Sequence, residues 1–464
     1  MNHNHRKSYT TRGWKSLAAF LLCALAVQAH AQNAVETWAG GKYASGNWLG
    51  LRDNLEEHGI VFSGSWKGTF YGIVDGGLQQ RGAFDEEIRF GLKLDFEKLA
   101  GITGLSAFGS VRWRDGQNPD AYVGASPAFN PSYMQVGKQW RFMPMYLTWE
   151  SRNLLPVTDM ITLSGGWQNP YDFFLQQPES KLFVNNAITQ TKGITANGIP
   201  FNGSYAAWGG YAKIKPTSWS YLQGGLYAAV PEATNTTNHG LYFALAQPAY
   251  RNGLYALAEA GVTPKLGSAQ LPGKYAFGGY YWGLENRSFN GQPYDGKYGF
   301  YWQADQMIFR EPSPQEPAPL GKGPSDGKSV AGKSFKEPVG DKPKLSEQGL
   351  YFFSMLNYAP SYDNSLPLYF QTGLVYKGLI PTRDFDQLGV AFGFGSYSYD
   401  KILAERNVGN PIHQTMEGVL EFDYRVQVTK FAYVQPFLQY LIRPNGTGLV
   451  ENATILGLHM GVTF

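Results

Sequence analysis

The chain has 464 residues, of which 43% are hydrophobic, 15% aromatic and only 16% charged, with 56 glycines, 27 prolines and one cysteine. The charged fraction is well below the roughly 25% of an average soluble protein. No stretch approaches the ~18 consecutive apolar residues of a membrane helix, which excludes a helical membrane protein. One cysteine excludes both a disulfide scaffold and a cysteine-ligated metal domain. The composition is typical of an all-β protein in which alternate residues meet lipid.

Residues 1–31 have the pattern of an export signal. A basic region is followed by the apolar stretch Leu17–Val27, and Ala29-His30-Ala31 supplies the small residues that a signal peptidase requires. We therefore expect cleavage before Gln32. The signal holds four basic and no acidic residues, so the formal net charge falls from +3 for the whole chain to −1 after cleavage. This balance gives no argument for a nucleic-acid partner.

Residues 32–60 precede the first expected strand and are predicted to form a periplasmic segment with a short helix over 47–58. Asn47 is a suitable N-cap, Leu51 and Leu55 form one apolar stripe, and Gly59 ends the helix. A segment of ~30 residues is too short to form a plug domain, so we expect passive diffusion rather than energy-coupled transport.

From residue 61 onward, polar and apolar residues alternate. Over 87–97, EIRFGLKLDFE, charged residues occupy one face and Ile, Phe and Leu the other, and 62–70, 417–427 and 456–464 repeat the pattern. A strand produces this split, whereas a helix does not. A soluble β-sandwich also alternates. The aromatic apolar faces, the dense charges of both signs opposite them, the export signal and the terminal Phe464 favour a transmembrane β-barrel in the bacterial outer membrane.

Sixteen strands are expected, an even number as a single-chain bacterial barrel requires. They begin near residues 61, 86, 104, 140, 158, 201, 218, 252, 273, 297, 346, 367, 385, 414, 430 and 453. With both termini periplasmic, the long links such as 115–139 and 168–200 follow odd strands and are external. The exception is 311–345, which is rich in Pro, Lys and Gly, and is predicted to be a disordered periplasmic insertion into the barrel of residues 61–464.

Three segments carry a resemblance to a known family. They are SGNWLGLRDNLEEHGI at 45–60, QTGLVYKGLIPTRDFDQLG at 371–389, and the Glu-rich strand over 417–446 that leads into Gln435-Pro436, Gln439-Tyr440 and Pro444-Asn445-Gly446. In this order they resemble the carbohydrate-selective porin (OprB) family. Phe437, Asn445 and the 311–345 insertion depart from the family pattern. The resemblance implies a sixteen-stranded outer-membrane channel, functional as a monomer, for diffusion of sugars and polyols. The residues themselves do not distinguish a monomer from a trimer.

A sixteen-stranded barrel leaves an aqueous lumen, which something must narrow. The 168–200 loop is the best candidate, and the alternative is a loop folded over the rim. Alternation along each strand, here called strand parity, predicts which charged side chains of the barrel wall face the lumen. We expect the following residues to line the pore: Asp172 from the loop, and Lys67, Glu87, Arg89, Lys93, Asp95, Arg112, Arg114, Glu150, Glu421, Asp423 and Arg425 from the wall.

A wall of mixed charge offers donors and acceptors to hydroxyl groups, whereas a net-positive ring selects anions. The expected function is therefore passive diffusion of small neutral carbohydrates or polyols, such as glucose-like monosaccharides, through a barrel embedded in outer-membrane lipid. The alternative is a porin for hydroxylated or aromatic acids such as quinate, or a general small-solute pore. It requires net positive charge at the constriction. The wall charges can also simply pair with one another.

An enzyme is not expected. After the signal only four histidines remain, none with a paired metal-ligand spacing, and no nucleophile motif or phosphate-binding glycine loop is present. We accordingly expect no cofactor, no metal ion and no catalytic residues.

Overall fold

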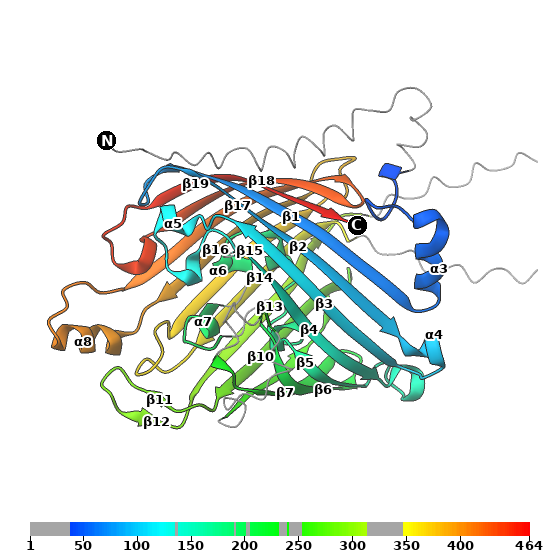
Figure 1. The fold of residues 1–464 in the computed structure, drawn as a ribbon, viewed down its shortest axis with the longest axis horizontal. Coiled ribbons are helices and arrows are strands. Elements are labelled where there is room, and N and C mark those ends of the chain that lie inside the picture. The colour runs from blue at the N-terminus through cyan, green and yellow to red at the C-terminus, as the bar shows by residue number, and fades with distance from the viewer. Residues whose placement is uncertain are drawn as a thin grey trace, which may run out of the picture.

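Antiparallel strands follow one another around a closed sheet in the computed structural model (Figure 1). The structure describes residues 38–134, 138–189, 192–200, 205–231, 239–240, 253–312 and 347–464. The export signal expected over 1–31 and most of the insertion expected over 311–345 lie outside the described residues.

Within the described part of the chain, sixteen long strands build the barrel. They are β1 (Ile60–Asp75), β2 (Gly82–Asp95), β3 (Leu105–Gly116), β4 (Gln139–Glu150), β5 (Ile161–Gln168), β6 (Ala207–Thr217), β7 (Ser220–Ala228), β8 (Leu254–Val262), β10 (Leu271–Trp282), β13 (Lys297–Arg310), β14 (Gly349–Tyr358), β15 (Leu368–Lys377), β16 (Gln387–Ser396), β17 (Met416–Thr429), β18 (Ala432–Ile442) and β19 (Ala453–Thr463). The short β9 (Lys265–Leu266) pairs with β10, and β11 (Asn286–Arg287) pairs with β12 (Pro293–Tyr294).

The helices are short and lie in the connections. They are η1 (Trp48–Gly50), α3 (Leu51–Glu57), α4 (Phe96–Ala100), α5 (Asp120–Val123), η2 (Pro127–Phe129), η3 (Arg152–Leu154), η4 (Pro170–Asp172), η5 (Glu179–Leu182), α6 (Asn186–Thr189), α7 (Lys192–Thr195), α8 (Tyr399–Asn407) and η9 (Pro444–Gly446). Among the described residues, no helix combines the length and the apolar content needed to cross a membrane.

The first and last strands close the sheet. β1 pairs with β2 on one side and with β19 on the other, in a register that runs from Ser65 opposite Thr463 to Tyr71 opposite Gly457. Every strand of the barrel is antiparallel to its neighbours. The predicted sixteen-stranded antiparallel β-barrel is thereby confirmed.

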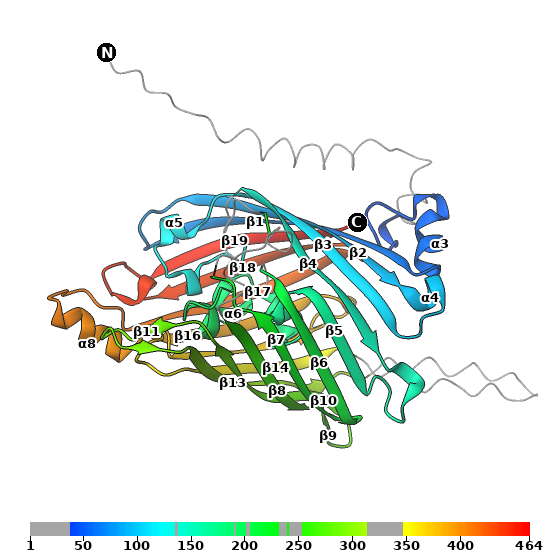
Figure 2. The same ribbon diagram turned by 60° about the horizontal axis from the view of Figure 1, so that its bottom comes forward.

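The two ends of the barrel differ. Figures 1 and 2 place α3, α4 and the C-terminus at one end, and α5, α8 and the β11–β12 hairpin at the other. Short links, such as residues 218–219 and 430–431, join strands at the end that carries the C-terminus. The 117–138 and 397–415 links begin at the opposite end.

The alternation of side chains gives the barrel an apolar exterior and a polar interior. On β2, Phe90 and Leu92 are exposed on the outer face, whereas Glu87 faces inward and is buried against arginines of the neighbouring strand. The same outer surface carries Phe62, Phe70, Leu147, Leu222, Phe277 and Trp302. Such a surface suits lipid, because mid-bilayer exposure of Arg or Lys costs roughly 2–4 kcal/mol.

The N-terminal helix docks through a charged residue rather than through the expected leucine stripe. Leu51 is 55% exposed, whereas Arg52 is 1% exposed. The Arg52 guanidinium lies 3.1 Å from the ring centre of Tyr43 and donates to the Phe62 carbonyl at 2.8 Å. The hydrogen bond to Phe62 therefore attaches the helix to β1, and the cation–π contact joins the helix to the segment that precedes it.

Inward aromatic rings lie over glycines of neighbouring strands. A Cβ atom at Gly278 would stand 2.3 Å from the Tyr301 ring, and one at Gly457 would stand 2.0 Å from the Phe437 ring. Glycine is required at these positions because a ring from the next strand occupies the place of a side chain.

Gly278→Ala should therefore destabilise the barrel by about 1–3 kcal/mol, the usual cost of overpacking. Gly165→Ala is the matched control, because a Cβ atom there meets nothing within 4 Å. The measurement is the unfolding free energy of each purified barrel in urea. An equal loss for both variants would contradict the packing argument.

Candidate functional site

The link between β5 and β6, called the 169–206 loop, is described over 169–189, 192–200 and 205–206. Its described part lies inside the barrel, where α6 contacts β15 and β16 and α7 contacts β14 and β15; Figures 1 and 2 show α6 among the strands. The loop begins with η4, whose first turn is capped by Asn169: its side-chain oxygen accepts from the N–H of Tyr171 at 3.1 Å. Pro170 is the first residue of η4 and Pro178 is the N-cap of η5, and the fixed φ of proline suits the start of a helical turn. Short helical turns thus provide hydrogen-bond partners for backbone N–H and C=O groups of the loop inside the lumen.

Polar side chains of the wall hold this loop. The Glu421 carboxylate of β17 accepts from the backbone N–H groups of Val184 at 2.8 Å and Asn185 at 3.0 Å. On the loop, Gln177 donates to the Ser354 carbonyl of β14 at 2.8 Å. Glu179 pairs with Lys377 of β15 at 2.9 Å. The loop is therefore attached to three wall strands by charged and amide contacts.

The described residues 117–134 of a second connection, which joins β3 to β4 and is called the 117–138 connection, also pack inside the barrel. Its Val123, Ala128 and Phe129 belong to one buried apolar cluster together with loop residues Phe183 and Ile188. The Asn186 N–H donates to the Asn130 carbonyl at 3.0 Å, which joins the two loops directly. From the sequence we expected an external loop over 115–139. Its apolar residues instead bury against the 169–206 loop.

Tyrosines fill the lumen beside β6, β7, β8, β10 and β13. Tyr221 and Tyr301 both donate to the Glu259 carboxylate, at 2.7 and 2.8 Å. Loop residues Phe173 and Phe174 pack against Tyr211. Further rings in this cluster come from Tyr227, Tyr255 and Tyr280. This side of the barrel interior is packed with aromatic side chains.

On the other side, a polar cavity of about 390 Å³ separates the 169–206 loop from the wall formed by β17, β19, β1, β2 and β3. Its charged lining comprises Lys67, Glu87, Arg89, Arg114, Asp172, Lys181 and Arg425. Its neutral polar lining includes Ser65, Tyr133, Asn169, Gln176, Gln177, Ser180, Thr189 and His459. Such a lining presents hydrogen-bond donors and acceptors from several directions.

The structure brings six of the twelve expected pore residues to this cavity: Lys67, Glu87, Arg89, Arg114, Asp172 and Arg425. The other six lie elsewhere. Arg112 is buried beside Glu87, while Glu421 and Asp423 are covered by the loop, where Asp423 accepts from Gln435. Lys93, Asp95 and Glu150 lie near the ends of their strands, at the end of the barrel that carries the C-terminus. Asp95 also caps α4. Parity predicts an inward side chain, but it gives neither depth along the barrel nor coverage by a loop.

Sequence reasoning missed Tyr133, because its loop was expected outside the barrel. Strand alternation also points His459 inward, although it is not among the expected pore residues. In the structure, His459 Nδ1 lies 2.8 Å from the Thr69 hydroxyl and Nε2 lies 3.0 Å from the Tyr433 hydroxyl. Both ring nitrogens are thus engaged with the wall, which fixes the orientation of the imidazole.

Glu87 is the acidic centre of the wall. Its carboxylate lies 2.6 Å from Arg114, 3.3 Å from Arg89 and 3.8 Å from Arg112. One carboxylate is therefore shared by three guanidinium groups, which keeps their planar faces oriented. In the described part of the chain, no group of three or more His, Cys, Asp or Glu side chains has an arrangement that could hold a metal ion.

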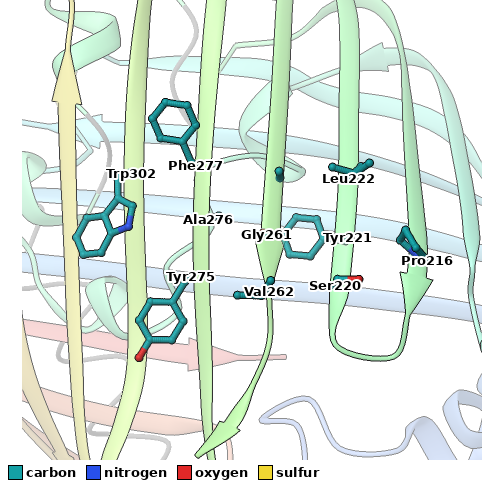
Figure 3. A pocket seen from close by; sticks show the side chains of 11 residues that line it. Pro216, Ser220, Tyr221, Leu222, Gly261, Val262, Tyr275, Ala276, Phe277 and Trp302 are labelled. Atoms are coloured by element: carbon teal, nitrogen blue, oxygen red, sulfur yellow. The ribbon is translucent and has the colours of Figure 1, made fainter.

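A second hollow lies on the outer surface, near the β6–β7 turn. Figure 3 shows Leu222 on β7, Phe277 on β10 and Trp302 on β13 around it. These three side chains belong to the exposed apolar exterior. The hollow has few polar groups with which to orient a hydrophilic solute, so the lumenal cavity is the better candidate site.

A closed sixteen-stranded barrel with an apolar exterior, a polar interior and a loop folded into its lumen defines an outer-membrane porin. The family model described as "Carbohydrate-selective porin, OprB family" matches residues 79–464. The chain belongs to this family, which confirms the resemblance seen in the sequence. Family membership also places it among porins rather than enzymes.

Individual relatives agree with this assignment. Porin B of Pseudomonas aeruginosa is 25% identical over 469 residues, covering 96% of each chain. The putative porin QuiX of Acinetobacter baylyi is 22% identical over 447 residues, covering 90% of this chain and 92% of the relative. The high-pH structure of Pseudomonas putida OprB superposes with a TM-score of 0.77 at 22% identity, covering 91% and 99% of the two chains.

Removal of the Glu421 carboxylate should loosen the 169–206 loop. In Glu421→Ala the N–H groups of Val184 and Asn185 lose their acceptor, at a cost of about 1–3 kcal/mol to the attached loop. We expect a higher and noisier single-channel conductance in planar bilayers. Glu451→Ala, in an exposed connection, is the control. A conductance of Glu421→Ala equal to that of the control would contradict the role of this tether.

Asp172 should make ion selectivity depend on pH. Its carboxyl is exposed to the lumen, and the protein around the lumen displaces part of its surrounding water, which raises its pKa to about 6, although Arg89 and Lys181 favour the charged form. Tyr146 and Tyr227 also lie within electrostatic range. The carboxyl is charged above its pKa and neutral below, so the chloride-to-potassium permeability ratio should rise between pH 7.5 and pH 5.

The measurement is the reversal potential in a salt gradient. Asp172→Asn should already have the higher ratio at pH 7.5 and should lose the part of the pH response due to Asp172. An identical pH response in Asp172→Asn and the unmodified protein would show that another group is responsible.

Proposed function

We propose that this porin lets sugars and polyols diffuse passively across the outer membrane, and that solutes pass through the cavity between the 169–206 loop and the wall. Export of the chain by cleavage of residues 1–31 belongs to the same proposal. The observation that carries it is the lumenal cavity, in which charged groups of both signs stand beside amides and hydroxyls.

The chemistry of the cavity supports a polyhydroxylated solute. The Arg89 guanidinium is partly exposed and lines the cavity. Tyr133 lines the cavity as well. These donors, together with acceptors such as the Asp172 carboxylate, can replace water around hydroxyl groups. A solute with many hydroxyls then loses less free energy on leaving bulk water than an apolar solute of equal size.

The packing of the lumen supports a constriction at the cavity. The tyrosine cluster fills the interior beside β6–β13, and Glu421, Gln177 and Glu179 hold the loop to the wall. Because the tyrosine cluster and the wall contacts hold the loop from two sides, the cavity between loop and wall keeps a fixed width. Fixed donors and acceptors give selectivity because they are not reorganised as each solute passes.

Solute entry into proteoliposomes tests the proposal. Glucose and sorbitol should enter faster than the disaccharide sucrose, and entry of glucose should saturate. Arg89→Ala should raise the half-saturating glucose concentration by about three- to tenfold, as expected for the loss of a hydrogen bond to a charged group.

Arg287→Ala is the matched control, because Arg287 is exposed on β11 at the far end of the barrel. Correct folding of each variant is checked by its heat-modifiable mobility in a gel. Equal rates for glucose and sucrose, or no glucose entry through folded protein, would contradict the proposal.

A further inference from the structure

The charges around the lumenal cavity do not balance. Its lining contains five basic side chains, three of which are Lys67, Lys181 and Arg425, and two acidic ones, Glu87 and Asp172. This differs from the evenly mixed wall that strand parity predicts, because the acidic residues Asp95, Glu150, Glu421 and Asp423 lie outside the cavity. A net-positive constriction favours anions.

The negative charge of Glu87 is already engaged. It lies 2.6 Å from Arg114 and within 4 Å of Arg89 and Arg112. A solute therefore meets Glu87 as part of a cationic cluster rather than as a free carboxylate.

Three cations lack such a partner. Lys67, Lys181 and Arg425 form no salt bridge with any carboxylate in the described ranges. Lys181 donates to the Gln176 side chain at 2.7 Å and Arg425 to that of Gln435 at 2.7 Å, both neutral acceptors. Lys67 lies with its Nζ atom 5.5 Å from the centre of the Tyr133 ring and has Glu87 within electrostatic range. Among the described residues, none of the three cations is neutralised by a direct ion pair.

We propose that the cavity binds a monoanionic polyhydroxylated solute, a sugar acid such as an aldonate or a uronate, in preference to the corresponding neutral polyol. This inference rests on the proposed function and assigns the class of solute within it. Lys67 and Arg425, on wall strands β1 and β17, receive the carboxylate. The hydroxyls of the solute meet Tyr133, Arg89 and the amides of the 169–206 loop.

Asp172 limits the preference to a single negative charge. It stands on the loop side of the cavity, within electrostatic range of Arg89 and Lys181. A second carboxylate on the solute meets this negative charge, whereas a hydroxyl can donate to it. The arrangement therefore suits one carboxylate at one end of a chain of hydroxyls.

Gluconate and sorbitol provide a matched pair of probes, since they share a six-carbon hydroxylated skeleton and differ at one end by a carboxylate. Each is added to single channels in a planar bilayer at constant ionic strength, and the concentration that blocks half of the ion current is measured. Gluconate should block at about one tenth of the sorbitol concentration, because its carboxylate makes charge-assisted hydrogen bonds.

Lys67→Met and Arg425→Gln should each move this ratio toward one. Lys67→Met is the cleaner variant, because Lys67 forms no hydrogen bond within the described chain. Arg287→Gln, which removes an exposed positive charge far from the cavity, should keep the tenfold ratio. A ratio that falls equally in Arg287→Gln would indicate a general field rather than this site and would overturn the proposal.

The outcomes separate the two proposals. Block by sorbitol and gluconate at equal concentrations in the unmodified protein, with glucose entry into proteoliposomes intact, overturns the sugar-acid assignment and leaves the sugar channel standing. No block by either probe and no glucose entry overturns the proposed function itself.

Discussion

Closure of the hydrogen-bonded sheet is the constraint on which the rest of the molecule depends. In lipid, each backbone N–H and C=O must find a partner within the protein, and a barrel meets this requirement only if its first and last strands pair. The pairing of β1 with β19 supplies this closure. In the closed barrel, each strand has one favourable orientation of its two faces: aromatic and aliphatic side chains face lipid, and charged side chains face the lumen. Slippage by one residue would expose arginines such as Arg89 to lipid.

A closed sixteen-stranded barrel leaves more interior space than a selective channel can use, and this chain fills it unevenly. Tyrosines and the Phe173-Phe174 pair occupy the space beside β6–β13. Two loops pack onto each other and onto the opposite wall, where Glu421 accepts backbone N–H groups of the 169–206 loop and Glu417 accepts that of Ser126 in the 117–138 connection. The remaining polar cavity lies beside β17–β19 and β1–β3. Selectivity is therefore a consequence of which part of the lumen remains unfilled.

The parts of this arrangement that could be predicted from sequence are those governed by local pattern. Period-two alternation predicted the strands, and the even strand count with alternating link lengths predicted a closed barrel. The sequence also indicated the 168–200 segment as the constriction loop, because it is long and rich in polar and aromatic residues. Parity correctly identifies an inward direction for a residue such as Arg112, but not that a loop and a neighbouring Glu87 bury it.

The inward packing of the 117–138 connection could not be read from the sequence for a related reason. Its apolar residues Val123 and Phe129 are also compatible with an external loop, and their burial depends on a partner more than fifty residues away. The charge balance at the cavity likewise depends on three-dimensional neighbours. Lys181 and Lys67 are far apart in sequence and meet only when the 169–206 loop folds against β1.

The central claim is that solute passes beside β1–β3 and not through the tyrosine-filled side. The one cysteine of the chain, Cys23, lies in the expected signal, so single cysteines can be placed and labelled without interference. Ser65 lines the cavity, and Gln223 lies in the tyrosine-filled side, where its side-chain amide donates to Glu259 at 2.9 Å. A bulky thiol reagent should reduce the single-channel conductance of Ser65→Cys severalfold and leave that of Gln223→Cys unchanged. Block at Gln223→Cys with free conduction through labelled Ser65→Cys would place the passage on the other side and contradict the account.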